Sequence, residues 1–195
     1  MAITAETVKQ LRDMTGLGMM KCKEALEATQ GDLEKAVEHL RKLGLKTAEK
    51  RAGRETSEGV IASYIHSNSK IGVLLELKCE SDFVARNDDF RQLARDLCMQ
   101  VAATRPIAVS RDQVAPAVIE KEREIYREQV KDKPPQAVEK IVAGKLDAFF
   151  KEHCLLDQPF VKDPKHTVAD LLNALIAKLG ENIAVSRFVR LQLGE

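Results

Sequence analysis

The chain has 195 residues, of which 44% are hydrophobic and 31% charged, enough for one medium domain or a small domain joined to a larger one. Lysine and arginine number 31 against 30 acidic residues, so the net charge of +1 gives no field to hold a polyanion, and aromatic residues are only 4%. Direct binding of nucleic acid is therefore disfavoured, because phosphate binding needs clustered cations and base stacking needs aromatic rings.

The cysteine spacing and the N-terminal sequence indicate in which cellular compartment the protein is expected. Cys22, Cys79, Cys98 and Cys154 are widely spaced, and none forms the C-x-x-C pair that zinc or redox chemistry prefers. The N-terminus has no apolar run and carries Glu6, which argues against a secretory or transit peptide. No window approaches the ~20 apolar residues of a membrane helix. These features predict a soluble cytoplasmic protein with free thiols, no bound metal and no membrane contact.

Residues 1–53 are predicted to fold as a small domain of three short helices. Thr4 can cap the first helix, whose apolar stripe reaches Met14. Gly31 ends the second helix and Gly44 the third. Helices this short are not stable alone, so the three must share one core.

Segment 46–58 marks the boundary to a second domain, residues 54–195. It mixes charges of both signs with almost no apolar residues, as a solvated linker or an exposed helical extension does. Beyond it the apolar period changes from 3.6 to 2 over residues 59–66 and 71–77. The polar turn at 67–70 joins these two runs, which predicts an antiparallel hairpin.

The rest of the second domain is predicted to be helical up to a last strand. Ser110 and Gln113 have the spacing of a capping box and predict the start of a long charged helix. Apolar periodicity predicts helices over residues 82–103, 110–131, 136–154 and 167–179, and a strand over 183–193. The fold class is therefore α+β, with a small sheet of about three strands, a helical hairpin, and helices gathered on one side of the sheet.

No motif predicts an active site. Gly16 and Gly18 invite comparison with phosphate-binding loops, but a helix precedes them and no Gly-Lys-Ser/Thr follows, which favours a plain helix–helix turn. Cys79 and His66 could form a nucleophilic pair, yet they fall at opposite ends of the predicted hairpin. The pattern favours a turn histidine and a small buried thiol.

Two short segments leave a choice between core and contact. Met19 and Met20 begin a helix beside an open turn, and by pattern alone they are more often core than contact. Phe83 could lie in the first turn of a helix capped by Ser81 and point out of the domain. The alternative, which the pattern favours, makes Phe83 the first position of an apolar stripe that continues at Phe90.

Three segments of the chain closely resemble signatures of the elongation factor Ts family. They are residues 11–26, 81–87 and 158–163, and the resemblance extends in order along essentially the whole chain. Ser81 stands where the family usually has Thr, and Leu17 where Ala is common. Both differences keep the local chemistry.

The resemblance implies a guanine-nucleotide exchange factor for elongation factor Tu that needs no cofactor and no covalent catalysis. The N-terminal helices resemble the family's ubiquitin-associated-type domain, for which Arg12, Met19 and Met20 are implied contacts. Asp82 and Phe83 are implied to intrude beside the partner's magnesium and phosphate site, with Phe83 as the wedge. The C-terminal region is implied to touch the partner's third domain.

The resemblance also implies a homodimer. The chain has room for one sheet-bearing subdomain where longer members have two, so it resembles a short form completed by a second copy joined through the sheets. An isolated three-stranded sheet with helices on one side also leaves an apolar face to cover. Two rival functions stay open: an interaction module without exchange activity, and a cysteine hydrolase built on Cys79 and His66.

Overall fold

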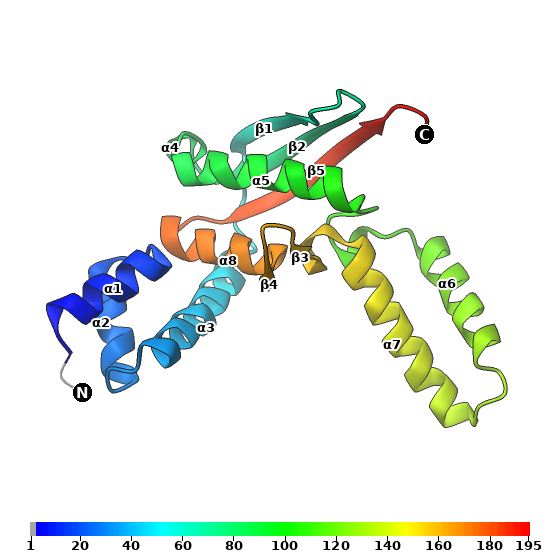
Figure 1. The fold of residues 1–195 in the computed structure, drawn as a ribbon, viewed down its shortest axis with the longest axis horizontal. Coiled ribbons are helices and arrows are strands. Elements are labelled where there is room, and N and C mark those ends of the chain that lie inside the picture. Colours follow the sequence, from blue (N-terminus) through cyan, green and yellow to red (C-terminus); the bar gives the residue numbers. More distant parts are fainter. Residues whose placement is uncertain (1–2) are drawn as a thin grey trace. The chain divides into compact units, whose positions relative to one another are not determined.

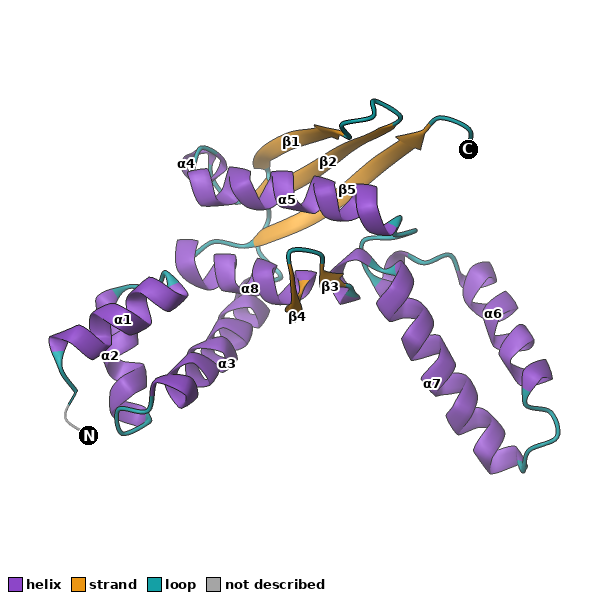
Figure 2. Cartoon of the chain, viewed as in Figure 1, coloured by secondary structure: helices purple, strands orange, loops and turns teal. Residues whose placement is uncertain are grey.

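The structure, a computed structural model, describes residues 3–195 and has the α+β class that the sequence predicts (Figures 1 and 2). Its helices and strands, in chain order, are α1 (Ala5–Thr15), α2 (Met19–Ala28), α3 (Leu33–Arg51), β1 (Glu58–Ile65), β2 (Ile71–Cys79), α4 (Asp82–Ala85), α5 (Asp88–Thr104), α6 (Pro116–Gln129), α7 (Pro135–His153), β3 (Pro159–Phe160), β4 (Asp163–Thr167), α8 (Val168–Leu179) and β5 (Ile183–Gln192). Short 3-10 turns lie at Arg111–Gln113 and Leu155–Asp157.

The chain forms two compact units that are discontinuous in sequence. Unit 1 comprises the residues up to Gly59 together with 78–90 and 170–184, and unit 2 comprises 60–77, 91–169 and 185–195. Helices α1 to α3, which we call the N-terminal module, therefore share a unit with the turn around α4 and with most of α8. The division into domains 1–53 and 54–195 stays a prediction.

The N-terminal module begins and turns as its sequence predicts. Thr4 caps α1 in a capping box, because the Thr7 amide donates to Thr4 Oγ1 at 3.2 Å and the Thr4 amide donates to Thr7 Oγ1 at 3.1 Å. Gly16 ends α1 in the left-handed conformation at φ 66°. The three helices enclose one core, built on fully buried side chains such as Leu11 and Leu26.

Helix α3 does not end at Gly44, so the predicted end is wrong. It continues to Arg51, which makes the first part of segment 46–58 a helical extension. Gly44 is buried, and a Cβ added there would lie 3.5 Å from the Ala177 Cβ of α8. That distance is an ordinary van der Waals contact, so Gly44 lies where α3 packs against α8, and this packing outweighs its low helix propensity, about 1 kcal/mol less favourable than that of alanine.

Most of the antiparallel sheet lies in unit 2, with the strand order β1-β2-β5. Helix α5 lies across one face of this sheet in Figure 1. On β2, Val73, Leu75 and Leu77 are buried, while Leu74 between them is 53% exposed. The predicted period of two is therefore confirmed, and it separates a covered face from an open one.

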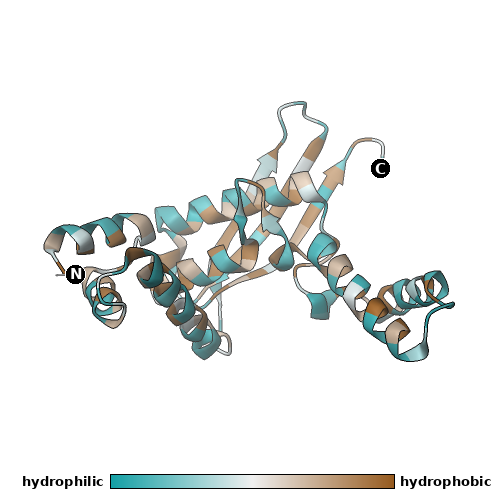
Figure 3. Ribbon diagram, turned by 60° about the horizontal axis from the view of Figure 1, so that its bottom comes forward, coloured by the Kyte–Doolittle hydropathy of each residue, from teal (hydrophilic) through white to brown (hydrophobic). Residues whose placement is uncertain are grey.

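The open face, which we call the outer sheet face, is apolar. Its exposed hydrophobic residues come from all three strands and are Ile61, Ile65, Leu74, Val189 and Leu191. Gly72 shares this face, because a Cβ there would lie 3.1 Å from Ile65 Cδ1. An ion pair of 2.7 Å between Arg187 Nε and Glu76 Oε2 crosses from β5 to β2. Figure 3 shows hydrophobic residues, in brown, recurring along these strands.

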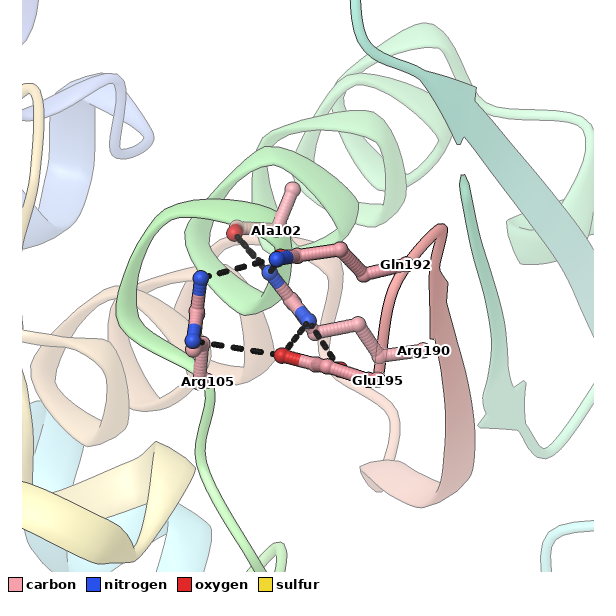
Figure 4. A network of polar contacts seen from close by, with 5 residues as sticks. All are labelled: Ala102, Arg105, Arg190, Gln192 and Glu195. Carbon is pink, nitrogen blue, oxygen red and sulfur yellow. Dashed lines mark hydrogen bonds and ion pairs between the residues drawn. The ribbon is translucent and has the colours of Figure 1, made fainter. Parts of the chain in front are cut away.

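A polar network ties the end of β5 to the end of α5 (Figure 4). The Arg190 guanidinium is nearly buried and donates to the Ala102 carbonyl, to Gln192 Oε1 at 2.6 Å and to the Glu195 carboxylate at 3.1 Å. Arg105 donates to the same Gln192 oxygen and pairs with Glu195. Cations at the C-terminal end of α5 also complement its helix dipole. The network fixes β5 so that alternate residues face outward.

The predicted helical hairpin is present as α6 and α7, which lie side by side (Figure 2). The predicted capping box at Ser110 is wrong. Gln113 Oε1 instead accepts from the Val109 amide at 3.2 Å, and Ser110 precedes a 3-10 turn with no side-chain cap. Helix α6 begins only at Pro116, a residue suited to the first helical position because its missing N–H would have no partner there.

The two-stranded sheet β3-β4 was not predicted from the sequence. A buried amide pair holds the chain that enters it: Gln100 Nε2 donates to Gln158 Oε1 at 3.1 Å, and Gln100 Oε1 accepts from the Val161 amide at 2.8 Å. Thr104 Oγ1 donates to the same Gln158 oxygen at 2.6 Å. Strands β3 and β4 pair antiparallel, with Pro159 opposite Thr167 and Phe160 opposite Asp163, and segments this short and irregular carry no apolar period that would predict them.

Replacing Gly144 by alanine is expected to stabilise the chain by about 0.5–1 kcal/mol, because this glycine is exposed inside α7 and its Cβ would meet nothing within 4 Å. Urea unfolding measures the change. Gly180→Ala is the matched control: its Cβ also meets nothing, but φ is 78°, so we expect a destabilisation of about 1–2 kcal/mol. Equal effects of both variants would contradict the backbone argument.

Candidate partner-binding site

Helix α4 is a single turn that carries Asp82 and Phe83. Ser81 is its N-cap, with Oγ accepting from the Val84 amide at 3.4 Å. Val84 and Ala85 are buried, whereas Phe83 is 80% exposed. One side of this helical turn is therefore buried, and the aromatic ring of Phe83 projects from the other side into solvent.

The predicted single helix over residues 82–103 is wrong, and with it the assignment of Phe83 to the stripe of Phe90. The chain leaves the helix after α4, and Asn87 Oδ1 accepts from the Asp89 amide at 2.9 Å, which caps the new helix α5. Phe90 is fully buried. Since α4 and α5 are separate helices, spacing along the sequence does not carry the apolar stripe across the break.

Asp82 has a local cationic partner. Its Oδ2 accepts from Arg86 Nη2 at 2.8 Å, and both side chains are more than half exposed. Exposed pairs of this kind contribute about 0–1 kcal/mol. The Asp82 carboxylate is therefore close to free for interaction with a partner group.

The methionines of the N-terminal module lie on its surface, and the preference for a core position is wrong for both Met19 and Met20. Met19 is 43% exposed and Met20 66% exposed, and Arg12 is exposed as well. Met14, which the periodicity placed with the buried stripe, is 60% exposed. Helix α2 begins after the Gly16 turn, and Met19 and Met20 lie on the exposed side of its first turn, while Cys22 on the other side is buried.

The N-terminal module is attached to α8 within unit 1. Arg41 Nη2 forms an ion pair of 2.7 Å with Asp170 Oδ2, and Lys21 Nζ donates to the Ala177 carbonyl at 3.1 Å. A small pocket of about 150 Å³ lies between Leu17, Leu40 and Ala177. All five candidate residues belong to unit 1, namely Arg12, Met19, Met20, Asp82 and Phe83.

The other candidate chemistry has ordinary structural explanations. Gly18 is the N-cap of α2 and follows a helix rather than a strand, as the helix–helix turn predicted. Cys79 donates to the Ser81 carbonyl at 3.2 Å, and burial raises the pKa of its thiol to about 11, which disfavours the thiolate. His66 Nδ1 lies 3.0 Å from the Tyr64 hydroxyl.

Residues 3–195 contain no cluster of histidine, cysteine, aspartate and glutamate side chains suited to a metal ion. Over the same residues, every helix is too short or too polar to cross a membrane.

Comparison with known proteins gives a consistent result along the chain. Residues 2–195 match the family described as Elongation factor TS. The chain is 59% identical over 196 residues to Elongation factor Ts of Thermodesulfovibrio yellowstonii, covering 100% of this chain and 98% of that protein. It is 58% identical to Elongation factor Ts of Fervidobacterium nodosum, with 100% of both chains covered. The protein of that name from Nitratidesulfovibrio vulgaris is 57% identical, with 100% and 98% covered.

Proposed function

The chain belongs to the elongation factor Ts family of translation elongation factors, and from this premise we propose that it binds elongation factor Tu and promotes the release of GDP. The observation that carries the proposal is the exposure of Phe83, at 80%, on a turn whose neighbouring residues are buried. An aromatic ring held outward on a turn whose other residues are buried suits a protein interface, because phenylalanine is among the residues enriched in interface cores.

Exchange requires no covalent chemistry from this chain. A factor that binds the nucleotide-free partner more tightly than the GDP-bound partner must weaken GDP binding by the same factor. In our proposal Phe83 is a wedge that displaces a helix of the partner. Asp82 acts beside it as a charged or hydrogen-bonding group near the partner's magnesium and phosphate site. Displacing a ligand of the magnesium ion would weaken the binding of that ion. Loss of the ion would remove much of the positive charge that holds the phosphates.

The N-terminal module supplies the second part of the proposed interface. Arg12 offers a cation, and Met19 and Met20 offer flexible apolar side chains that adapt to a partner surface. All three are exposed. Because the module and the Phe83 turn belong to one unit, contacts made by the module can hold the wedge at the partner's nucleotide site.

We also propose that the chain forms a homodimer through the outer sheet face. Five large aliphatic side chains, each more than half exposed, point from this face. A contiguous apolar patch on three strands is typical of an interface, and a two-fold axis would bury the same patch on both copies. We further propose that the protein acts in the cytoplasm without binding nucleic acid or membrane directly, and its membership of a family of translation factors supports this proposal.

The decisive test is the release of a fluorescent GDP analogue from elongation factor Tu, with excess unlabelled GDP. Substoichiometric amounts of this chain are expected to accelerate release catalytically, because each molecule is freed when a new nucleotide binds the partner. No acceleration by a folded sample that still binds the partner would contradict exchange. That result would favour the interaction module without exchange activity. The cysteine hydrolase would be favoured instead if the chain showed a hydrolytic activity that thiol alkylation abolished.

A further inference from the structure

We infer that Glu181 is a positioning residue for the exchange wedge, an inference that rests on the proposed function. Glu181 follows α8 and lies 100 residues from Ser81 in sequence. Its Oε1 accepts from Ser81 Oγ at 2.6 Å, and its Oε2 accepts from the Ser81 backbone amide at 3.0 Å. Both oxygens of one carboxylate are thus used on the residue that directly precedes Asp82 and Phe83.

A second carboxylate makes the reverse connection. Glu80 Oε1 accepts from the backbone amide of Asn182, the residue after Glu181. This hydrogen bond is the main cause that lowers the pKa of the Glu80 carboxyl. Asn182 is buried, and its Nδ2 donates to the Arg54 carbonyl at 2.8 Å. Glu80–Ser81 and Glu181–Asn182 therefore form a reciprocal pair of bonds, which we call the clasp.

The clasp matters because α4 cannot hold its own direction. A helix of four residues lacks the cooperative hydrogen bonds that stabilise longer helices. Ser81 Oγ links the two structures: it donates to Glu181 and accepts from the Val84 amide of α4. Charge-assisted hydrogen bonds such as those to Glu181 are shorter and stronger than neutral ones. Glu181 thereby fixes the start of the turn from which Phe83 projects.

The clasp also lies within unit 1, together with the N-terminal module. Arg54 Nη1 lies 3.4 Å from Glu80 Oε2, and Arg51 Nη1, at the end of α3, lies 4.0 Å from Glu80 Oε1. The wedge is therefore connected to the element that ends the N-terminal module. We assign Glu181 a role that acts through Ser81 and Phe83 rather than through contact with the partner.

A double-mutant cycle between Glu181 and Phe83 tests the inference. Catalysed GDP release from elongation factor Tu is measured for the parent chain, Glu181→Ala, Phe83→Ala and the double variant. We expect Glu181→Ala to lower kcat/KM about 10-fold in the parent, the size of effect that loss of charge-assisted hydrogen bonds gives. In the Phe83→Ala background we expect less than a twofold further loss, because there is no ring left to position.

Conservative variants and a control sharpen the result. Glu181→Gln keeps one acceptor oxygen, so its kcat/KM for GDP release should lie between those of the parent and Glu181→Ala. Ser81→Thr keeps the hydroxyl that donates to Glu181 and should retain exchange. Glu49→Ala removes an exposed glutamate of unit 1 and should have no effect. Thermal unfolding of each variant is measured in parallel, since a purely structural role would lower exchange equally in both backgrounds.

The possible outcomes distinguish failure of the positioning role of Glu181 from failure of the proposed exchange function. An equal loss in both backgrounds, or an active Glu181→Ala, overturns the positioning role while leaving exchange intact. A parent chain that fails to accelerate release overturns the proposed function and the positioning role with it. A loss confined to the background that retains Phe83 supports both.

Discussion

Phe83→Ala is expected to lower catalysed GDP release by on the order of 30-fold, the equivalent of about 2 kcal/mol for the loss of an aromatic anchor at an interface. The reason is that truncation at Cβ removes the ring that would displace the partner's helix. Because Phe83 is 80% exposed, the same change should alter the stability of the free chain by no more than about 0.5 kcal/mol. Release of a fluorescent GDP analogue measures the effect.

Two comparisons identify the step that is lost. Ile107→Ala truncates another exposed apolar side chain, which is 54% exposed, and should leave exchange unchanged. The double variant Met19→Ala and Met20→Ala should raise the concentration needed for half-maximal acceleration while leaving the maximal rate close to the parent, because these side chains are proposed to bind rather than displace. Full exchange activity of Phe83→Ala would show that the wedge assignment is wrong.

Leu191→Glu is expected to convert the proposed homodimer to monomers at micromolar concentration. The substitution places a carboxylate at the outer sheet face of each copy, and burying an unpaired charge costs several kcal/mol. A penalty of about 3 kcal/mol weakens dimerisation more than 100-fold. Leu191 is 70% exposed in the single chain, so the fold itself should tolerate the change. Equilibrium sedimentation distinguishes the 21.7 kDa chain from twice that mass.

The control for the sheet variant is Ile107→Glu, which adds the same charge at an exposed apolar position that belongs to no strand. It should leave the dimer intact. A parent chain that sediments at 21.7 kDa under the same conditions would contradict the homodimer. If the parent is dimeric and Leu191→Glu remains so, a surface other than the outer sheet face joins the copies.

The elements predicted correctly from the sequence are those set by residues close together in the chain. Thr4 and Thr7 cap α1 through contacts three residues apart, and the left-handed Gly16 ends it. Pro135 begins α7 for a similarly local reason, because its missing N–H would have no helical partner there and its fixed φ suits the helix. The alternation of β2 follows directly from its two-residue period.

Two helix boundaries predicted from the sequence are wrong because another contact outweighs the local signal. Gly44 continues α3 instead of ending it, because Ala177 of α8 packs against it. The capping box expected at Ser110 does not form, because the side chain of Gln113 binds the Val109 amide. Ala177 lies far from Gly44 along the chain, whereas Val109 lies only four residues from Gln113, so the second boundary is decided by a competing local hydrogen bond.

The sequence by itself determined the fold class, the family and the identity of the candidate residues, because caps, periods and signatures are local features. Only the tertiary structure decided which of them are exposed. Met19, Met20 and Phe83 have apolar spacings that fit a core, and their exposure depends on which other helices fail to cover them. The clasp between Ser81 and Glu181 joins residues 100 positions apart, and no spacing along the chain records such a contact.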